Sequence, residues 1–178
     1  MSYSSLKRAS QNYYDSTDQL WDWYSQLSES DRRFVIEKGS WSVNDVFYHL
    51  MAIEEMMLRQ VRNRLISPNI KKAGWSHRKN AVLLLVALWL PKKYKAPSTV
   101  SVQDNERTFD LENWKSTRLE FQELILNYPK EHKTSLVFKH PLAGPLLMHH
   151  GVKFLTYHMK HHFQQLRAIS KSGGFETL

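Results

Sequence analysis

The sequence predicts an all-α fold in which long helices pack as a bundle. Three observations lead to this prediction. Apolar residues recur at helical spacing through several segments, capping residues and prolines mark the ends of those segments, and strand signals are scarce. We therefore expect fewer than about a tenth of the residues in strands, against a usual fraction of about 20–25%.

The first two helices are expected over residues 6–27 and from Ser42 to Pro68. Leucine and aromatic residues recur at spacings near seven in the first of these segments. The second begins with Ser42-Val43-Asn44-Asp45, in which the serine can cap the helix and the acid stands at its third position, much as in a capping box. Pro68 ends this helix.

Three further helices are expected over residues 78–90, 110–128 and 145–170. Pro91 and Pro129 stop the first two of them, and Gly173-Gly174 follows the third, which has a proline at its start. Residues 130–144 should form a loop with a short extended piece at 136–138. The connection from Tyr94 to Phe109 is longer than average, so it is expected to cross the bundle or to border a site.

The length and composition of the chain suit one ordinary domain. The 178 residues are expected to form a single helical bundle domain over residues 1–178. Cysteine is absent, which excludes a thiolate metal site and a cysteine nucleophile. No signal peptide is evident at the N-terminus, and the longest apolar run, residues 81–90, is shorter than the about 20 residues that span a bilayer. We expect a cytoplasmic protein without a transmembrane segment. Basic residues flank the run 81–90, which could therefore lie in a membrane interface, but we favour its interpretation as a buried bundle helix.

Positive charge is concentrated in one part of the chain. The net charge is +8, and residues 59–95 contain no acid but ten basic residues: Arg59, Arg62, Arg64, Lys71, Lys72, Arg78, Lys79, Lys92, Lys93 and Lys95. This asymmetry favours an anionic partner such as a small acid, a phosphate, nucleic acid or a membrane surface. Nucleic acid is the least favoured, because no aromatic platform is interleaved with the charges. We expect the segment to be solvated or to line the mouth of a site.

Histidines in two of the expected helices suggest a metal site. His158 and His162 are four residues apart, which places them one turn apart on the same helix face. His49 lies in the helix that follows Ser42, and its apolar neighbours on that face point it inward. Metal sites in bundles are built from inward side chains on facing helices. Three neutral histidines would hold one divalent ion and leave a position open for water or substrate.

The spacing does not choose all the ligands. His161 is three residues after His158 and could take the place of His162. His161, His150 and Gln165, which belong to the same expected helix, are candidates to support the ligands through hydrogen bonds.

No general base is evident beside the expected metal ligands. A His-Glu-x-x-His motif is excluded, because Met159 follows His158. Glu54 and Glu55 are the nearest candidates for a general base. The competing interpretation, which we favour, makes both of them solvated acids of a helix face.

Three segments of the chain resemble the DinB/YfiT-like superfamily. WSVNDVFYHL is similar to the family's Trp-Ser opening followed by a histidine, and HPLAGPLLMHHGVKFLTYHMKHHFQQL to its His-Pro and Gly stretch before a His-x-x-x-His helix. YKAPSTV is similar to the family's connection before the third bundle helix. The resemblance implies a four-helix bundle of up-down-down-up order, often a homodimer. It also implies one divalent metal ion, usually nickel or zinc, on His49, His158 and His162.

The resemblance also implies a class of activity. Members include proteins described as metal-dependent hydrolases and others similar to thiol S-transferases. The first expectation is therefore an enzyme whose metal ion activates water to hydrolyse a small-molecule substrate. The alternative is a transferase that presents a low-molecular-weight thiolate to an electrophile, with the basic segment 59–95 holding the acidic groups of the thiol. A third, less favoured hypothesis is a non-catalytic binding module that uses the same basic segment.

Overall fold

The computed structural model describes residues 3–89, 109–175 and 178. In this part of the chain the backbone is mostly helical, with one short sheet. The elements in chain order are α1 (Tyr3–Gln26), α2 (Glu29–Arg33), α3 (Val43–Leu65), α4 (Trp75–Trp89), α5 (Leu111–Leu126), the 3-10 turn η2 (Lys130–His132), β1 (Leu136–His140), β2 (Gly144–Leu147) and α6 (Met148–Gly173). The prediction of an all-α class with few strand residues is confirmed for these residues.

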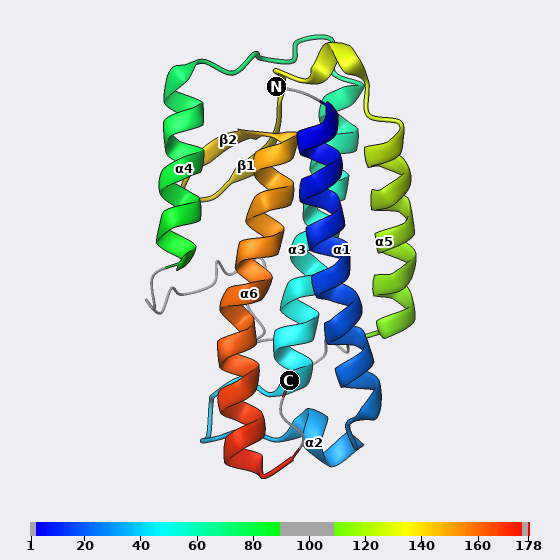
Figure 1. Cartoon of the computed structure of the whole chain (residues 1–178), viewed down its shortest axis with the longest axis vertical. Helices are drawn as coiled ribbons and strands as arrows, with labels where there is room; N and C mark the ends of the chain where they lie inside the picture. Colours follow the sequence, from blue (N-terminus) through cyan, green and yellow to red (C-terminus); the bar gives the residue numbers. More distant parts are fainter. Residues whose placement is uncertain (1–2, 90–108, 176–177) are drawn as a thin grey trace.

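Four long helices form the bundle. α1 and α3 each contact both α5 and α6, which closes a four-membered ring. Figure 1 shows that α1 and α6 run in one direction and that α3 and α5 run in the other. The chain order α1, α3, α5, α6 is therefore the up-down-down-up order expected above. α4 and the β1–β2 hairpin lie outside this ring, beside α6 (Figure 1).

The capping signals read from the sequence correctly mark where α3 begins. The Ser42 hydroxyl accepts a hydrogen bond from the backbone N–H of Asp45 at 3.2 Å, and the Asp45 carboxylate accepts one from the backbone N–H of Ser42 at 2.8 Å. Asp110 caps α5 in a similar way, by accepting from the backbone N–H groups of Glu112 and Asn113. These bonds satisfy N–H groups that otherwise lack a partner at a helix N-terminus.

The expected start of the last helix at Pro145 is wrong. Pro145 lies in β2, opposite Lys139 of β1, and α6 begins at Met148. A proline has no N–H to donate to the ladder, and it is tolerated at an edge of this two-stranded sheet as well as at a helix start. The expected extended piece is confirmed and is longer than predicted, because β1 runs from Leu136 to His140.

The apolar helix before Pro91 is only half buried. α4 begins at Trp75, three residues before the expected start, and Leu90 and Pro91 lie outside the described residues. Ala81 and Leu84 are buried, as expected of a bundle helix. The solvent-facing side of α4 does not fit the prediction of a buried helix. Three aliphatic side chains on this side are each more than half exposed: Val82, Leu83 and Val86.

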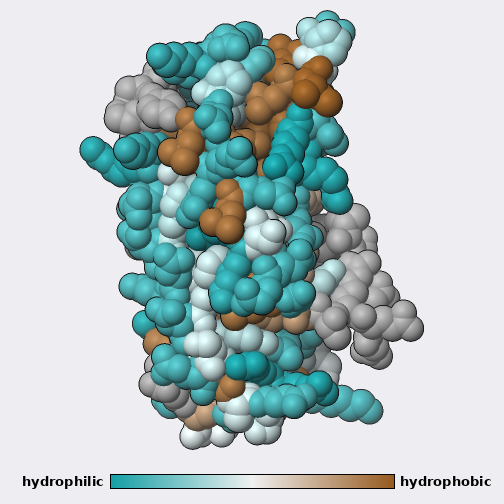
Figure 2. All heavy atoms as spheres, turned by 90° about the vertical axis from the view of Figure 1, so that its right-hand side faces the viewer, coloured by the Kyte–Doolittle hydropathy of each residue, from teal (hydrophilic) through white to brown (hydrophobic). Residues whose placement is uncertain are grey.

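The surface on the α5 side of the molecule is largely hydrophilic. Figure 2 shows that the hydrophobic residues on this face form scattered patches, the largest of them near one end of the molecule.

Among the described helices, none combines the length and the apolar character needed to cross a membrane. The long connection expected from Tyr94 to Phe109 lies outside the described residues except for Phe109.

A buried ion pair joins three helices of the bundle. Glu54 of α3 has no exposed surface, and its carboxylate accepts hydrogen bonds from Nε of Arg118 at 3.2 Å and from the hydroxyl of Tyr13 at 2.7 Å. Trp114 donates its indole N–H to the same carboxylate. Burial, and the charge of Glu54 beside it, raise the pKa of Tyr13 well above its usual value, so its hydroxyl remains a donor.

Replacing Glu54 by Gln should destabilise the protein severely. The substitution leaves the guanidinium of Arg118, which is 2% exposed, with a single acidic partner among the described residues, the largely exposed carboxylate of Asp18 at 4.0 Å. Breaking one partner of a buried pair typically costs about 3–5 kcal/mol. Urea unfolding followed by far-ultraviolet circular dichroism measures the loss. The matched control is Glu55→Gln at the next, partly exposed position, which should stay within about 0.5 kcal/mol of the wild type. Equal effects of the two changes would contradict the structural role of the pair.

Candidate metal centre

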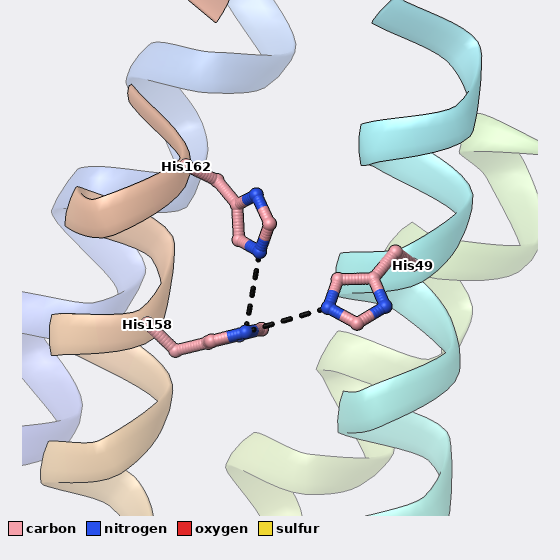
Figure 3. Close-up of side chains that lie close together, drawn as sticks. All are labelled: His49, His158 and His162. Atoms are coloured by element: carbon pink, nitrogen blue, oxygen red, sulfur yellow. Dashed lines mark hydrogen bonds between the residues drawn. The ribbon is translucent and has the colours of Figure 1, made fainter. Parts of the chain in front are cut away.

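Three histidine side chains from two helices converge on one point. Nε2 of His158 lies 3.3 Å from Nε2 of His49 and 3.2 Å from Nε2 of His162. In Figure 3 the rings of His158 and His162 reach from α6 toward the ring of His49 on α3. The three candidate ligand atoms all lie within 4.8 Å of one another. The structure therefore brings together the three residues that were predicted as metal ligands.

Local structure explains this convergence. The capping box at Ser42 sets the start of α3, and His49 follows it by about two helical turns. His158 and His162 are one turn apart on α6, which packs against α3. The side chains of His49 and His162 are buried, at 3% and 6% exposure, while His158 is partly exposed. The cluster is thus held by rigid helices and keeps one edge open.

A hydrogen bond from outside the cluster fixes the tautomer of His162. The side-chain oxygen of Gln165 lies 2.8 Å from Nδ1 of His162, so that nitrogen carries the proton and Nε2 has only a lone pair. Nε2 of His158 must then be the donor to His162, and its single N–H is the one hydrogen available for both short contacts if it also faces a lone pair of His49. The Nε2 lone pair of His162 therefore points into the cluster, in the direction that a metal ligand requires.

The spacing of the nitrogens fits a metal ion. Zinc binds histidine nitrogen at about 2.0–2.1 Å in tetrahedral geometry, which places two ligand nitrogens about 3.3 Å apart. The two measured separations, 3.2 and 3.3 Å, agree with this distance. Imidazole is also a good ligand for nickel. The residues present therefore suit a divalent ion of this kind, and the geometry does not decide which one.

The electrostatic environment keeps the rings of His158 and His162 neutral, as metal ligands must be. Burial lowers the pKa of His162 to about 3, and the nearby His49 adds to the effect. Burial also lowers the pKa of His158 well below its usual value, with contributions from the other histidines around it. Neutral imidazole offers its lone pair without first losing a proton, so the cluster can bind a metal ion at neutral pH.

Aromatic side chains that were not predicted as part of the site surround the three histidines. Trp41, which immediately precedes the capping serine of α3, lies parallel to His162 at 6.1 Å between ring centroids and 5.0 Å from the ring of His49. Phe154 stacks on His158 at 5.2 Å, and His140 packs edge-on against Phe154 at 4.7 Å. The available signals were the position of Trp41 beside the capping serine and the His140-Pro141 pair.

His140 is held in one tautomer. Its Nδ1 accepts hydrogen bonds from the backbone N–H groups of Leu142 and Ala143, both at 3.2 Å, so its proton lies on Nε2. Burial lowers the pKa of His140 to about 4. The ring is therefore neutral at physiological pH and packs against the same phenylalanine as His158.

Two of the other histidines predicted near the site lie outside the cluster. His161 is partly exposed, and its ring centroid lies 5.6 Å from that of His162. The structure thus selects His162 over His161. His150 packs against His149 at the start of α6, at 3.9 Å between ring centroids, two turns from His158. Gln165, in contrast, contacts His162 directly, as described above.

The two candidate bases do not join the histidines. Among the described residues, no carboxylate completes a group with the three histidine nitrogens. Interpreting Glu54 as a solvated acid is wrong, because its carboxylate is buried in the ion pair with Arg118. Glu55 is partly exposed and accepts a hydrogen bond from the side-chain amide of Asn113 at 2.8 Å.

The basic segment is solvated where the structure describes it. All seven of its basic residues between Arg59 and Lys79 are exposed, whereas Lys92, Lys93 and Lys95 lie outside the described residues. Arg59 and Arg62 line a hollow of about 230 Å³ between α3 and α5, together with Glu55. Ten residues of α3 separate Arg59 from His49, which corresponds to about 15 Å along the helix axis. These two arginines therefore do not line the mouth of the histidine cluster.

Comparisons with known proteins yield no assignment. No protein-family model matches the chain, and neither a curated protein nor a solved structure matches it. The function is therefore inferred from the geometry and chemistry of this chain.

Substitution of any one of the three clustered histidines by Ala should abolish stoichiometric metal binding. Removing one of three ligands leaves too few nitrogens to hold the ion, while the apolar core of the bundle remains intact. The purified protein would be stripped with chelator, reloaded with nickel or zinc and analysed by mass spectrometry for metal content. We expect one ion per chain in the wild type and little or none in His49→Ala, His158→Ala or His162→Ala.

Two further variants distinguish ligands from neighbours. His161→Ala should still bind one ion, because His161 lies outside the cluster. Gln165→Leu should bind more weakly by about 10–100-fold, because the hydrogen bond that orients His162 is lost. Full metal loading of His158→Ala, or loss of metal in His161→Ala, would show that the ligands have been assigned wrongly.

The protein should lose stability as the pH falls below about 6.5. Burial lowers the pKa of His140 to about 4 and that of His149 to about 3. The unfolded chain takes up these protons below about pH 6.5, whereas the folded chain resists them until the lower values. The free energy of unfolding should fall by about 1.4 kcal/mol per pH unit for each group.

Urea unfolding in the presence of chelator, at a series of pH values from 7 to about 4, would measure this slope. The variant His149→Leu removes one of the histidines whose pKa is lowered by burial, and the Nε2 of His149 is buried without a hydrogen-bond partner among the described residues. This variant should show a flatter pH dependence than the wild type. An unchanged slope would contradict the proposed role of His149.

Proposed function

We propose that this chain is a metal-dependent enzyme of the DinB/YfiT-like type, in which His49, His158 and His162 hold one nickel or zinc ion. One observation carries the proposal: ring nitrogens of three histidines converge at the spacing of metal ligands, and burial keeps the rings of His158 and His162 neutral. Three imidazoles that meet in this way offer the nitrogen ligands that zinc and nickel prefer, so the arrangement favours a site for a cation.

The residues around the cluster suit catalysis as well as binding. A divalent ion held by three protein ligands keeps a coordination position open and lowers the pKa of a bound water to about 7, which is the basis of metal-assisted hydrolysis. Gln165 orients the ring of His162, and the aromatic rings of Trp41 and Phe154 pack against the ligands and limit the access of bulk water. The partly exposed edge at His158 is the side from which a small substrate can approach.

A thiol S-transferase is the second candidate, and the scarcity of acids favours it. Within the described residues no carboxylate completes the histidine cluster, and Glu54 is occupied by Arg118. A thiol, with a pKa near 8.5, needs less help than water to lose its proton, so it requires no carboxylate base. In this version a metal ion held by the three histidines would bind a low-molecular-weight thiol as its thiolate, and the sulfur would be presented to an electrophile.

One assay distinguishes the two reactions. The metal-loaded protein would be incubated with esters, phosphoesters and alkylating electrophiles, each with and without a small thiol such as cysteine. A hydrolase consumes its substrate without the thiol, whereas a transferase requires it and yields a thioether that mass spectrometry identifies. Either activity should vanish in His158→Ala and persist in His161→Ala. Turnover that survives in chelator-treated His158→Ala, or a metal-loaded protein inactive in every arm, would overturn the proposal.

A further inference from the structure

Acidic residues are absent from several adjoining segments of the described structure. The sequence has no Asp or Glu between residues 56 and 103, and none between residues 132 and 175. In the described structure these stretches form most of the second half of α3, all of α4, the β1–β2 hairpin and α6. α4 contacts both α6 and β2, so the acid-free segments adjoin one another in space (Figure 1). The charged side chains within these two stretches are therefore all cationic.

An apolar stripe follows the outer face of α4. Trp75, Val82, Leu83 and Val86 are exposed by 77%, 58%, 56% and 52%. Spacings of seven, eight and eleven residues from Trp75 place these side chains within one sector about 100° wide. Ala81 and Leu84, which contribute to the core, lie on the opposite side of the helix. α4 is thus apolar on the face that packs against the protein, and its solvent-facing sector is apolar except for Lys79, one turn after Trp75.

Cations surround the beginning of this stripe. Lys71, Arg78 and Lys79 are exposed, and the ammonium of Lys79 lies 5.8 Å from the centroid of the Trp75 ring. An exposed tryptophan beside basic residues, followed by aliphatic residues on one helix face, is the composition of helices that lie in a membrane interface. The 15 residues of α4 extend about 22 Å, which is too short to cross a bilayer of about 30 Å.

We infer that the outer face of α4 docks on an anionic lipid surface. The stripe of Trp75, Val82, Leu83 and Val86 enters the boundary between headgroups and acyl chains, and Arg78 and Lys79 contact the lipid phosphates. This surface lies outside the ring of bundle helices that contains the histidine cluster, so the inference is independent of the proposed activity.

The charge distribution favours lipid over the other possible occupants. A second copy of this chain, docked through the same face about a two-fold axis, would bring two acid-free and cationic surfaces together. Nucleic acid would engage the cations but would leave the aliphatic stripe uncovered. An anionic bilayer engages the cations and the aliphatic side chains at the same time.

Vesicle flotation of the full-length protein tests this inference. The vesicles contain either phosphatidylcholine alone or phosphatidylcholine mixed with phosphatidylglycerol. We expect the wild type to float with the mixed vesicles, to do so less at high salt, and to stay in solution with phosphatidylcholine alone. The triple variant Val82→Gln, Leu83→Gln, Val86→Gln should lower partitioning by at least about tenfold. The double variant Arg78→Gln, Lys79→Gln should also bind less and lose its salt dependence.

The matched control is Leu119→Gln with Leu126→Gln. These two leucines are exposed by 66% and 65% on α5, so their loss removes similar apolar area from another face. This variant should float like the wild type, and circular dichroism verifies that every variant is folded. Three results would overturn the inference: no preference of the wild type for the mixed vesicles, undiminished flotation of the triple variant, or sedimentation showing that the stripe instead joins two copies of the chain.

Discussion

The buried ion pair between Glu54 and Arg118 fixes the orientation of α3 about its own axis. Glu54 follows His49 by five residues, so the two side chains project about 140° apart around the helix. Glu54 projects toward α1 and α5, where it contacts Tyr13 and Arg118. His49 projects toward α6, where it contacts His158. Because an unpaired buried charge is costly, α3 cannot turn without losing the partner of Glu54. The pair thereby also holds His49 in the direction of His158 and His162.

Aromatic rings make this buried charge tolerable. The guanidinium of Arg118 lies 4.5 Å from the ring centroid of Tyr13 and 4.9 Å from those of Tyr14 and Trp21. Ring faces attract a cation, which offsets part of the cost of removing it from water. The three rings belong to α1, so the same residues that solvate Arg118 also fasten α1 to α5. The metal cluster on α3 and α6 is therefore supported by contacts on the far side of α3.

Local patterns in the sequence were sufficient to predict much of the fold and of the site. Helical periodicity located the bundle helices, the capping box located the start of α3, and the four-residue spacing put His158 and His162 on one face. Spacing alone could not decide between His161 and His162, because both lie near the face of His158 and only the packing of α6 against α3 selects one. Glu54 could not be placed either, since its partner Arg118 is 64 residues away and no local pattern links them. The predicted start of the last helix at Pro145 was wrong because proline is tolerated both in an edge strand and at the start of a helix.

The position of Trp41 has a spectroscopic consequence. Its indole lies parallel to the ring of His162 and close to that of His49, so an ion at the cluster would be in the immediate vicinity of this fluorophore. Zinc has a filled d shell and leaves indole emission largely intact, whereas nickel, with unpaired d electrons, quenches it. Trp41 is therefore an intrinsic fluorescence probe of the cluster, and its emission would respond both to metal binding and to the electronic character of the bound ion.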